Sequence, residues 1–202
     1  SDTEADPHNS KRGFFFSHIG WLMLEKHEEV KKHGKKIDMS DIENDKIIMF
    51  QTKYNMLLTP FFCYILPLML NVYLLNEEWK CAVAWQWCIK YAFFLHAELT
   101  VNSVAHIYGY KPYDNNIKPA ESIFVSILTF GEGYHNYHHT FPYDYRASEY
   151  FDFINWSTLI IESWAKMGWA YDLKVASPEL ISKVKKKLGD GTDADIQHNS
   201  IC

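Results

Sequence analysis

The chain has 202 residues and a net charge of −5 at pH 7, and 48% of its residues are hydrophobic and 16% aromatic. This length allows a single domain, and an acidic balance without a long basic tract argues against a nucleic-acid-binding surface. Three of its four cysteines lie in apolar stretches and none forms a CxxC pair, so we expect free thiols and a reducing compartment on the functional side.

Two helices are predicted in the first part of the chain, residues 1–55, before the apolar stretches begin. Residues 21–32 contain Glu28 four positions before Lys32, a spacing that supports a helix. The sequence Ser-Asp-Ile-Glu at residues 40–43 fits a capping box, in which side chains satisfy the free N–H groups of a helix start. It predicts a second helix that runs from Ser40 toward the apolar region.

Two apolar stretches follow, Met56 to Leu75 and Cys81 to Val101. Each approaches the roughly 20 residues that a membrane-spanning helix needs. Because only residues 76–80 separate them, we interpret residues 56–101 as a transmembrane helical hairpin. Pro67 lies inside the first stretch and predicts a kink that a neighbouring helix must accommodate.

Positive charges on both sides of the hairpin favour a cytoplasmic location for the flanking segments. These charges include Lys46, Lys53, Lys111, Lys118 and Arg146. The alternative is a pair of buried helices in a soluble bundle. Lys90 and His96 inside the second stretch keep that alternative open, because charged and polar residues penalise membrane insertion, and the mean hydropathy of the chain is only −0.25.

Histidines cluster in the sequence GEGYHNYHH, where His135, His138 and His139 stand at i, i+3 and i+4. This spacing gathers three imidazoles on one helical face. A single box cannot fill a metal coordination sphere, so further ligands must come from elsewhere, and Asn102 and His106 form a second pair at i and i+4. Spacing alone leaves open a surface cluster without a metal, or zinc as the default metal.

The C-terminal part contains one well-marked helix. Ser177-Pro178-Glu179 is typical of a helix start, and Gly189 can end the helix. The remaining polar residues predict a disordered tail over residues 189–202.

Three segments together identify a resemblance: GEGYHNYHHTFPYDYRASEY, NSVAHIYGYKPYD and DPHNSKRGFFFSHIGWLM. They closely resemble the membrane-bound acyl-CoA desaturases of animals, of the stearoyl-CoA Δ9 type and its insect relatives. The resemblance extends from Thr3 to Leu188, with the segments in the family's order and a hydrophobic hairpin in the family's place.

The resemblance implies an all-α membrane protein. Its transmembrane hairpin would be half of a four-helix membrane region, joined to a helical cytosolic di-iron domain. The first expected division is a cytosolic helical segment over residues 1–55, followed by the hairpin over residues 56–101. A cytosolic helical region with the histidine box then covers residues 102–188, and the tail covers residues 189–202.

The resemblance also implies that the chain is the C-terminal portion of a longer protein. In the family an HRxHH box would precede Ser1, with another box further upstream. A complete member holds two irons with nine histidines. This chain would supply four, His106, His135, His138 and His139, and Asn102 would contribute through a bridging water. The chain alone is therefore expected to be inactive, because the remaining ligands are missing from it.

Two pairs of residues depart from the family where substrate binds. A basic pair that contacts coenzyme A phosphates corresponds here to Glu25 and Lys26, so one cation is replaced by an anion. A Thr-Trp pair that shapes the bend of the acyl tunnel corresponds to Glu98 and Leu99. Because a carboxylate in an apolar tunnel is costly, Glu98 must rotate outward, pair with a cation, or alter the tunnel.

The function implied is insertion of a cis double bond, at Δ9, into a saturated acyl-CoA. The reaction would use O2 and electrons from cytochrome b5 and its reductase, with a multi-pass protein in the endoplasmic reticulum membrane and its catalytic part in the cytosol. Two alternatives stay open: an acyl-CoA-binding protein that has lost turnover, suggested by Glu25 and Glu98, and another di-iron enzyme such as a fatty acid hydroxylase.

Overall fold

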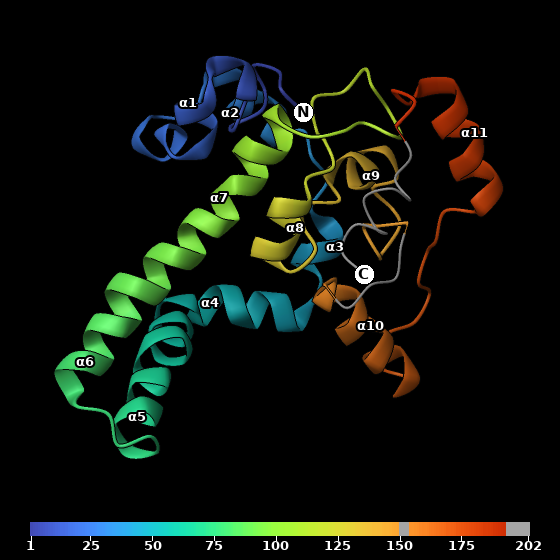
Figure 1. Ribbon diagram of the computed structural model, residues 1–202. Coiled ribbons are helices and arrows are strands. Elements are labelled where there is room, and N and C mark those ends of the chain that lie inside the picture. Colours follow the sequence, from blue (N-terminus) through green and yellow to red (C-terminus); the bar gives the residue numbers. More distant parts are fainter. Residues whose placement is uncertain (150–153, 193–202) are drawn as a thin grey trace. The chain divides into compact units, whose positions relative to one another are not determined.

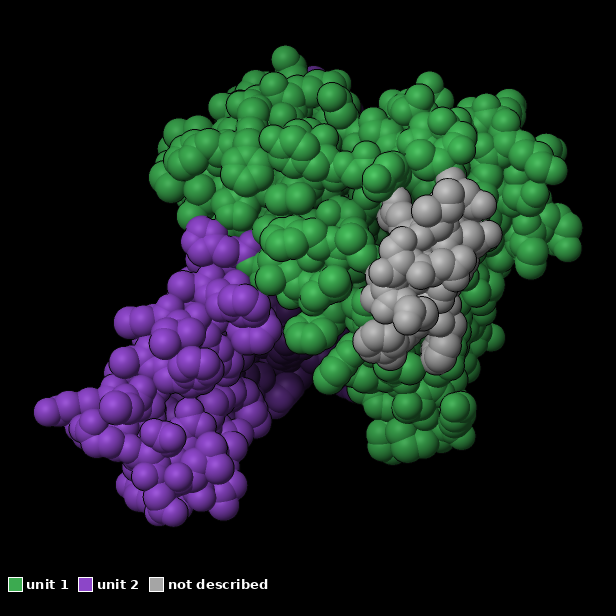
Figure 2. Space-filling view, in the orientation of Figure 1, with its two compact units in different colours: residues 1–30, 97–202 green, residues 31–96 purple. Residues whose placement is uncertain are grey.

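The computed structural model describes residues 1–149 and 154–192, which are helical with connecting loops (Figure 1). Within these ranges there is no strand, and only two isolated bridges pair Glu121 with Tyr110 and with Tyr134. The prediction of an all-α fold is confirmed. The chain divides into two compact units, residues 1–30 with 97–202 (unit 1) and residues 31–96 (unit 2) (Figure 2).

Unit 2 contains two long helical arms joined by a short turn. The first arm and the short helix before it comprise α3 (Ser40–Glu43), α4 (Lys46–Pro60), the π-helical turn η3 (Phe61–Ile65) and α5 (Leu66–Tyr73). The second comprises α6 (Trp79–Ala84), the π-helical turn η4 (Trp85–Lys90) and the start of α7 (Tyr91–Ile107), whose last residues belong to unit 1.

One helix among the described residues, Lys46–Tyr73, is long and apolar enough to cross a membrane. None of its most apolar window is buried within the structure, which suits a helix that faces lipid. The second arm is helical over the residues where the predicted hairpin places its second helix. It does not meet the combined requirement of length and hydropathy that the first arm meets. A membrane crossing by the second arm stays a prediction.

The prediction that the long helix begins at Ser40 is wrong. α3 ends at Glu43, and α4 begins only after Asp45, whose carboxylate accepts the N–H groups of Ile47 and Ile48 at 2.8 and 3.1 Å. Asp45 is therefore the cap of the long helix. A stronger cap five residues downstream interrupts the helix that the capping box predicted.

Pro67 shapes the contact between the two arms. A proline has no N–H, so it cannot donate to the carbonyl of the residue four positions earlier, here Cys63. The buried side chain of Gln86 supplies the missing donor, with Nε2 2.5 Å from the Cys63 oxygen. The rings of Tyr64 and Trp87 stack beside this contact at 4.5 Å between centroids. The neighbouring helix thus accommodates the proline, as the sequence predicted.

Unit 1 contains the remaining helices. They are η1 (Ser10–Arg12), α1 (Phe14–His18), η2 (Gly20–Met23), the start of α2 (Glu28–Gly34), α8 (Ile123–Thr129), α9 (His135–Thr140), α10 (Trp156–Lys166) and α11 (Pro178–Leu188). A small core packs α9 against α11 and the loops before them; it consists of Tyr113, Tyr137, Phe141, Ala176 and Ile181.

Two local predictions in unit 1 have different outcomes. The single helix predicted over residues 21–32 is wrong, because η2 ends at Met23 and α2 begins at Glu28. The helix predicted after Ser177 is confirmed as α11, with the Ser177 hydroxyl accepting the N–H of Leu180 at 3.2 Å.

The end of the chain is described only as far as residue 192. Asp190 is held to the loop after α7, since its carboxylate accepts the N–H of Lys111 at 2.7 Å. Most of the predicted disordered tail, residues 193–202, lies outside the described residues.

Candidate metal centre

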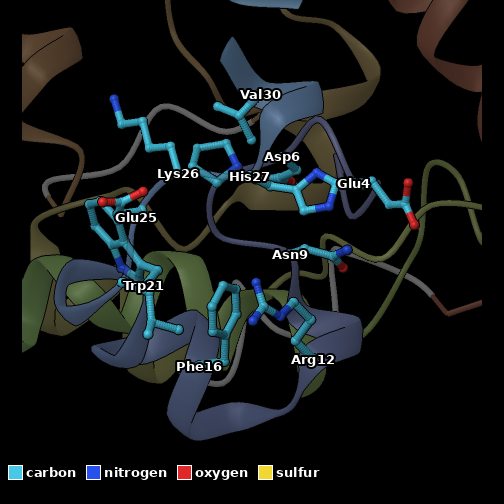
Figure 3. Close-up of a pocket in the computed structure, with 12 residues that line it drawn as sticks. Glu4, Asp6, Asn9, Arg12, Phe16, Trp21, Glu25, Lys26, His27 and Val30 are labelled. Atoms are coloured by element: carbon cyan, nitrogen blue, oxygen red, sulfur yellow. The ribbon is translucent and has the colours of Figure 1, made fainter. Parts of the chain in front are cut away.

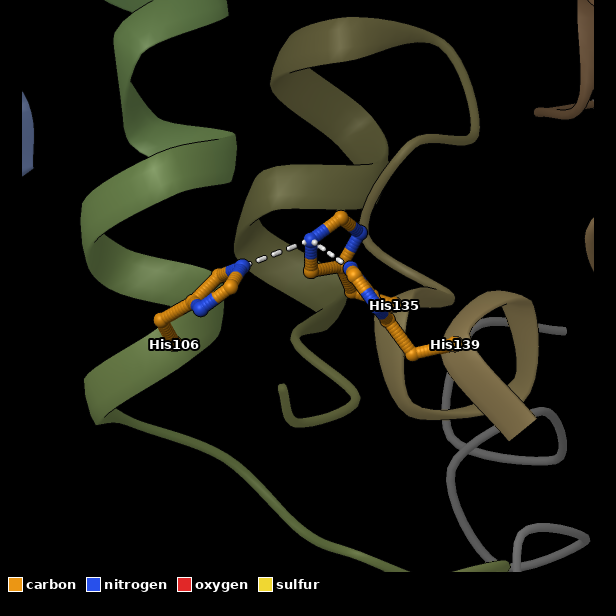
Figure 4. Close-up of side chains that lie close together, drawn as sticks. All are labelled: His106, His135 and His139. Atoms are coloured by element: carbon orange, nitrogen blue, oxygen red, sulfur yellow. Dashed lines mark hydrogen bonds between the residues drawn. The ribbon is translucent and has the colours of Figure 1, made fainter. Parts of the chain in front are cut away.

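Three imidazoles converge in unit 1 (Figure 4). His106 comes from the last turn of α7, and His135 and His139 come from successive turns of α9. The Nε2 atom of His135 lies 2.9 Å from Nε2 of His106 and 3.2 Å from Nε2 of His139. All three potential ligand atoms lie within 4.8 Å of one another.

The geometry of these nitrogens fits a bound metal ion. His106 donates its Nδ1 proton to the carboxylate of Asp2 at 2.9 Å, which leaves the lone pair of Nε2 facing the other two rings. Two imidazoles that bind one metal at about 2.1 Å place their nitrogens roughly 3.0–3.4 Å apart. The observed separation of 3.2 Å falls within this range, and that of 2.9 Å lies just below it.

The rings are also in the protonation state that metal binding needs. Burial, followed by the neighbouring histidines, lowers the pKa of His135 to about 2. The same causes lower the pKa of His139 to about 4. Both imidazoles are therefore neutral at pH 7, and each keeps one ring nitrogen with a lone pair that a metal can use.

Asp2 is a part of the site that sequence reasoning missed. One oxygen of its buried carboxylate accepts a hydrogen bond from His106 Nδ1. The other oxygen accepts the backbone N–H of Ser10 at 2.8 Å. Although burial alone would raise the pKa of Asp2, these hydrogen bonds lower it, so the carboxylate stays charged. Nothing in the local sequence distinguishes Asp2 from Glu4 or Asp6, so only the fold identifies it.

His138 and Asn102, the other predicted ligands, lie outside this group of three. His138 has a buried Nδ1 without a hydrogen-bond partner among the described residues. An unsatisfied buried nitrogen is costly, and a metal ion would satisfy it. Asn102 is half-buried on α7, one turn before His106. Their roles as ligands, directly or through water, stay predictions.

Asn136 anchors the start of α9 with every hydrogen-bonding atom of its side chain. Its Oδ1 accepts the N–H groups of Tyr113 and Asp114 at 2.9 and 3.1 Å. Its Nδ2 donates to the carbonyls of Asp114 and Pro119 at 2.9 and 2.8 Å. Because the side chain is fully buried, these four bonds hold the helix firmly against the preceding loop.

Tyr137 anchors the same helix through an ion pair between the buried Asp144 and the partly buried Arg146. Its hydroxyl donates to Asp144 at 2.7 Å, and Arg146 binds both oxygens of Asp144 at 2.7 and 3.0 Å. The N–H of Ala176 donates to the same carboxylate at 2.9 Å. In the sequence, Arg146 was only one of the positive charges that indicate membrane topology. In the structure, it also binds the Asp144 carboxylate that holds Tyr137, and so helps to fix α9.

The predicted substrate residues Glu25 and Lys26 are both exposed and line a pocket of about 360 Å³ in unit 1 (Figure 3). Another cation, Arg12, lines the same pocket, with its guanidinium 3.6 Å from the centre of the Phe16 ring. Sequence reasoning missed Arg12 as a pocket residue. The pocket carries charges of both signs beside the aromatic ring of Trp21.

The residues at the predicted tunnel bend point in different directions. Glu98 is exposed, whereas Leu99 is 3% exposed. The choice among the three alternatives for Glu98 in the whole protein stays a prediction. The part of either residue in an acyl tunnel stays a prediction.

Sequence comparisons give a consistent result. Residues 1–152 match the family described as fatty acid desaturase. The chain is 48% identical to an acyl-CoA Delta-9 desaturase of Acheta domesticus, over 95% of this chain and 54% of that protein. It is 50% identical to an acyl-CoA Delta(11) desaturase of Spodoptera littoralis, over 96% of this chain and 57% of that protein. It is 49% identical to stearoyl-CoA desaturase of Homo sapiens, over 95% of this chain and 53% of that protein. The chain thus spans about half the length of these curated relatives.

Proposed function

The chain belongs to the fatty acid desaturase family, and on that premise we propose that the whole protein is an acyl-CoA desaturase, an oxidoreductase that introduces a cis double bond into a saturated acyl chain. The observation that carries this proposal is the convergence of His106, His135 and His139, within segments that match desaturases, on one point. A surface cluster without a metal would not require two buried rings, His106 and His135, with a carboxylate partner on His106.

The residues of this chain have distinct tasks in the proposed centre. His106, His135 and His139 would hold the metal through Nε2, while Asp2 keeps the ring of His106 and its Nδ1 proton in place. His138 and Asn102, the latter through a water, complete the share of this chain. Two bound irons would supply the activation of O2 that attack on an unactivated C–H bond requires, which no side chain can provide.

The proposed substrate is a fatty acyl-CoA. Lys26 and Arg12 offer cations to its phosphates in the pocket of unit 1, and Glu25 opposes them. The resemblance to the animal enzymes supports cytochrome b5 and its reductase as the electron source, and the endoplasmic reticulum membrane as the location, with several membrane crossings and the metal centre in the cytosol. The apolar helix Lys46–Tyr73 supports the membrane part.

The proposed position of the double bond is Δ9, as in the stearoyl-CoA type. The specific alternative is Δ11, because relatives of equal similarity carry the name Delta(11) desaturase. Glu98 and Leu99, which replace the usual pair at the tunnel bend, are the residues expected to decide between the two. Loss of turnover is the remaining alternative, motivated by Glu25 and Glu98.

The test is expression of the full-length protein in a yeast strain that lacks its own desaturase, with the double bonds located by mass spectrometry. New monoenoic acids would support the proposal, and their position would distinguish Δ9 from Δ11. A well-expressed, iron-loaded protein that forms no monoene would contradict it and favour an acyl-CoA-binding protein. The 202-residue chain by itself is expected to form none, because it supplies four of nine expected histidines.

A further inference from the structure

We propose that Glu121 is a positioning residue of the metal centre, whose buried carboxyl group holds the helix of His135 and His139 in register with the helix of His106. The proposal rests on the metal-centre function above and deepens it. Glu121 belongs to a three-residue segment, residues 120–122, that lies between the two ligand-bearing helices and that we call the strap.

The strap is bonded on one side to α7 and the residues just after it. The N–H of Ala120 donates to the carbonyl of Ala105, directly before His106, at 2.7 Å. The backbones of Glu121 and Tyr110 exchange two hydrogen bonds, at 2.7 and 3.2 Å. One edge of the strap is therefore tied to the chain on both sides of His106.

The other side of the strap is bonded to the start of α9. The N–H of Ser122 donates to the carbonyl of Gly133 at 2.9 Å. The Glu121 carboxyl group accepts the backbone N–H of Tyr137 at 2.7 Å. The first N–H groups of a helix have no partner within the helix, so the carboxyl group completes the helix start.

Two glycines let the strap come this close to its neighbours. A Cβ added at Gly109 would collide with the carbonyl oxygen of Glu121, and a Cβ added at Gly133 would collide with that of Ser122. Gly109 also has a φ of +140°, a conformation that favours glycine. The strap is thus closely fitted between the two segments, with glycine on each side.

The burial of Glu121 indicates that its carboxyl group has a specific task. The residue is 4% exposed, and burial raises its pKa to about 8 despite the backbone donor at Tyr137. Burying an ionisable group costs stability that an apolar side chain would not. Such a group is retained where its hydrogen bonds define a geometry.

That geometry matters because α9 cannot define its own position. A helix of six residues is too short to be stable in isolation, and a metal site tolerates displacements of only about 0.5 Å in its ligands. Asn136 holds α9 to the loop of residues 113–119, whereas Glu121 holds it to the strap and hence to α7. Loss of the Glu121 acceptor would therefore change the separation of His106 and His135.

The test uses the purified full-length protein with Co(II) in place of iron. Three variants are compared: Glu121→Gln, which keeps an acceptor oxygen, Glu121→Met, which has none, and Glu121→Asp, which moves the acceptor away. Glu179→Met, at an exposed glutamate of α11, is the matched control. Co(II) affinity is measured by competition with a chelator, the ligand-field spectrum reports coordination, and circular dichroism of the metal-free protein reports folding.

The Met variant is expected to lose about 10- to 100-fold in Co(II) affinity, the usual effect of removing an outer-shell partner, with a shifted ligand-field spectrum and unchanged helical content. The Gln variant should stay within about threefold of wild type, because its amide oxygen accepts the same N–H of Tyr137. A folded Met variant with wild-type affinity and spectrum would overturn the proposal.

Two further outcomes are decisive. If the Met variant does not fold, a folded Asp variant with unchanged Co(II) affinity and spectrum would overturn the role of Glu121, whereas a weakened one would support it. A wild-type protein that binds no Co(II) would overturn the metal centre itself, which distinguishes failure of the proposed function from failure of this inference.

Discussion

At the scale of single residues, Asp2 and His106 form the most direct support of the candidate metal centre. A carboxylate that accepts the second ring proton of a histidine sets the ring's orientation and increases its basicity as a ligand. Asp2 itself has a φ of 58°, a conformation that non-glycine residues adopt rarely. The backbone is thus held in an unfavourable conformation where the carboxylate meets His106.

Asp2→Asn is expected to lower the metal affinity of the full-length protein by about 10- to 100-fold, because the amide lacks the charge that stabilises the donated ring proton. The measurement is Co(II) competition with a chelator. Glu4→Gln, two residues away and exposed, is the control and should bind Co(II) like the wild type. Equal affinity in the Asn variant would show that the carboxylate does not tune His106.

Glu121 predicts a particular pH dependence of stability. Its pKa rises from 4.5 to about 8 on folding, chiefly through burial. Between these values the folded state binds a proton that the unfolded state has lost, so stability falls as pH rises through this window. The slope from this group reaches at most about 1.4 kcal/mol per pH unit.

Melting temperatures of the full-length protein in detergent, measured between pH 5 and 8, test this. Glu121→Gln should fall less steeply with pH than wild type, because the amide does not titrate. Parallel curves for the two proteins would mean that Glu121 has an ordinary pKa in the folded state.

Glu25 predicts a change in substrate affinity. Glu25→Arg replaces an anion beside Lys26 with the cation that the family resemblance expects, and should strengthen acyl-CoA binding by about two- to fivefold, the range for an exposed ion pair. Binding of a non-reactive acyl-CoA at low salt is the measurement. Glu43→Arg, on α3 and outside the lining of the pocket, should leave the affinity unchanged.

At the scale of elements, the hydrogen bond from Gln86 to the carbonyl of Cys63 explains how Pro67 is tolerated in the apolar arm. Because Pro67 has no N–H, it cannot donate to the carbonyl of Cys63. The side-chain amide of Gln86, from the other arm, donates to this carbonyl instead. Within a membrane there is no water to replace this donor. The interaction therefore couples the two arms at one position.

Gln86→Leu is expected to destabilise the full-length protein by about 1–2 kcal/mol, because the Cys63 carbonyl is left without a partner. In the double variant with Pro67→Ala, the new backbone N–H satisfies the carbonyl, so the cost of Gln86→Leu should largely disappear. The measurement is a double-mutant cycle of unfolding free energies in detergent. The exposed Gln51 of α4 provides the control Gln51→Leu, and equal costs in both backgrounds would contradict the coupling.

At the scale of the whole molecule, a hairpin places both of its flanks on one side of the membrane and its turn on the other. The turn between the arms contains the exposed Glu77, and the loop after α7 contains the exposed Asn116. The lysines and arginine on the flanks favour the cytosol for that side.

Cysteine labelling in sealed microsomes tests this arrangement. In a cysteine-free background, Asn116→Cys should react with a membrane-impermeant maleimide at once, whereas Glu77→Cys should react only after the membrane is permeabilised. Immediate labelling at both positions would contradict the hairpin and support the buried-helix alternative.

The sequence by itself determined the features that depend on local order. Caps predicted the helix Pro178–Leu188, apolar length predicted the apolar arm with its proline, and the spacing of His135 and His139 placed both rings on one helical face. The all-α class was implied by the family resemblance. The local predictions succeed because residues within a few positions interact through fixed helical geometry. Local caps also compete, which is why Asp45 displaced the predicted start at Ser40.

Only the tertiary structure decided which distant residues meet. His106 reaches His135 across 29 positions, and Asp2 reaches His106 across 104. Glu121 connects with both helices through backbone groups, which have the same chemistry in every residue. No local pattern encodes such contacts, because they depend on how loops return and on which buried groups lack partners. The candidate ligands could therefore be named from the sequence, whereas the residues that support them could be found only in the fold.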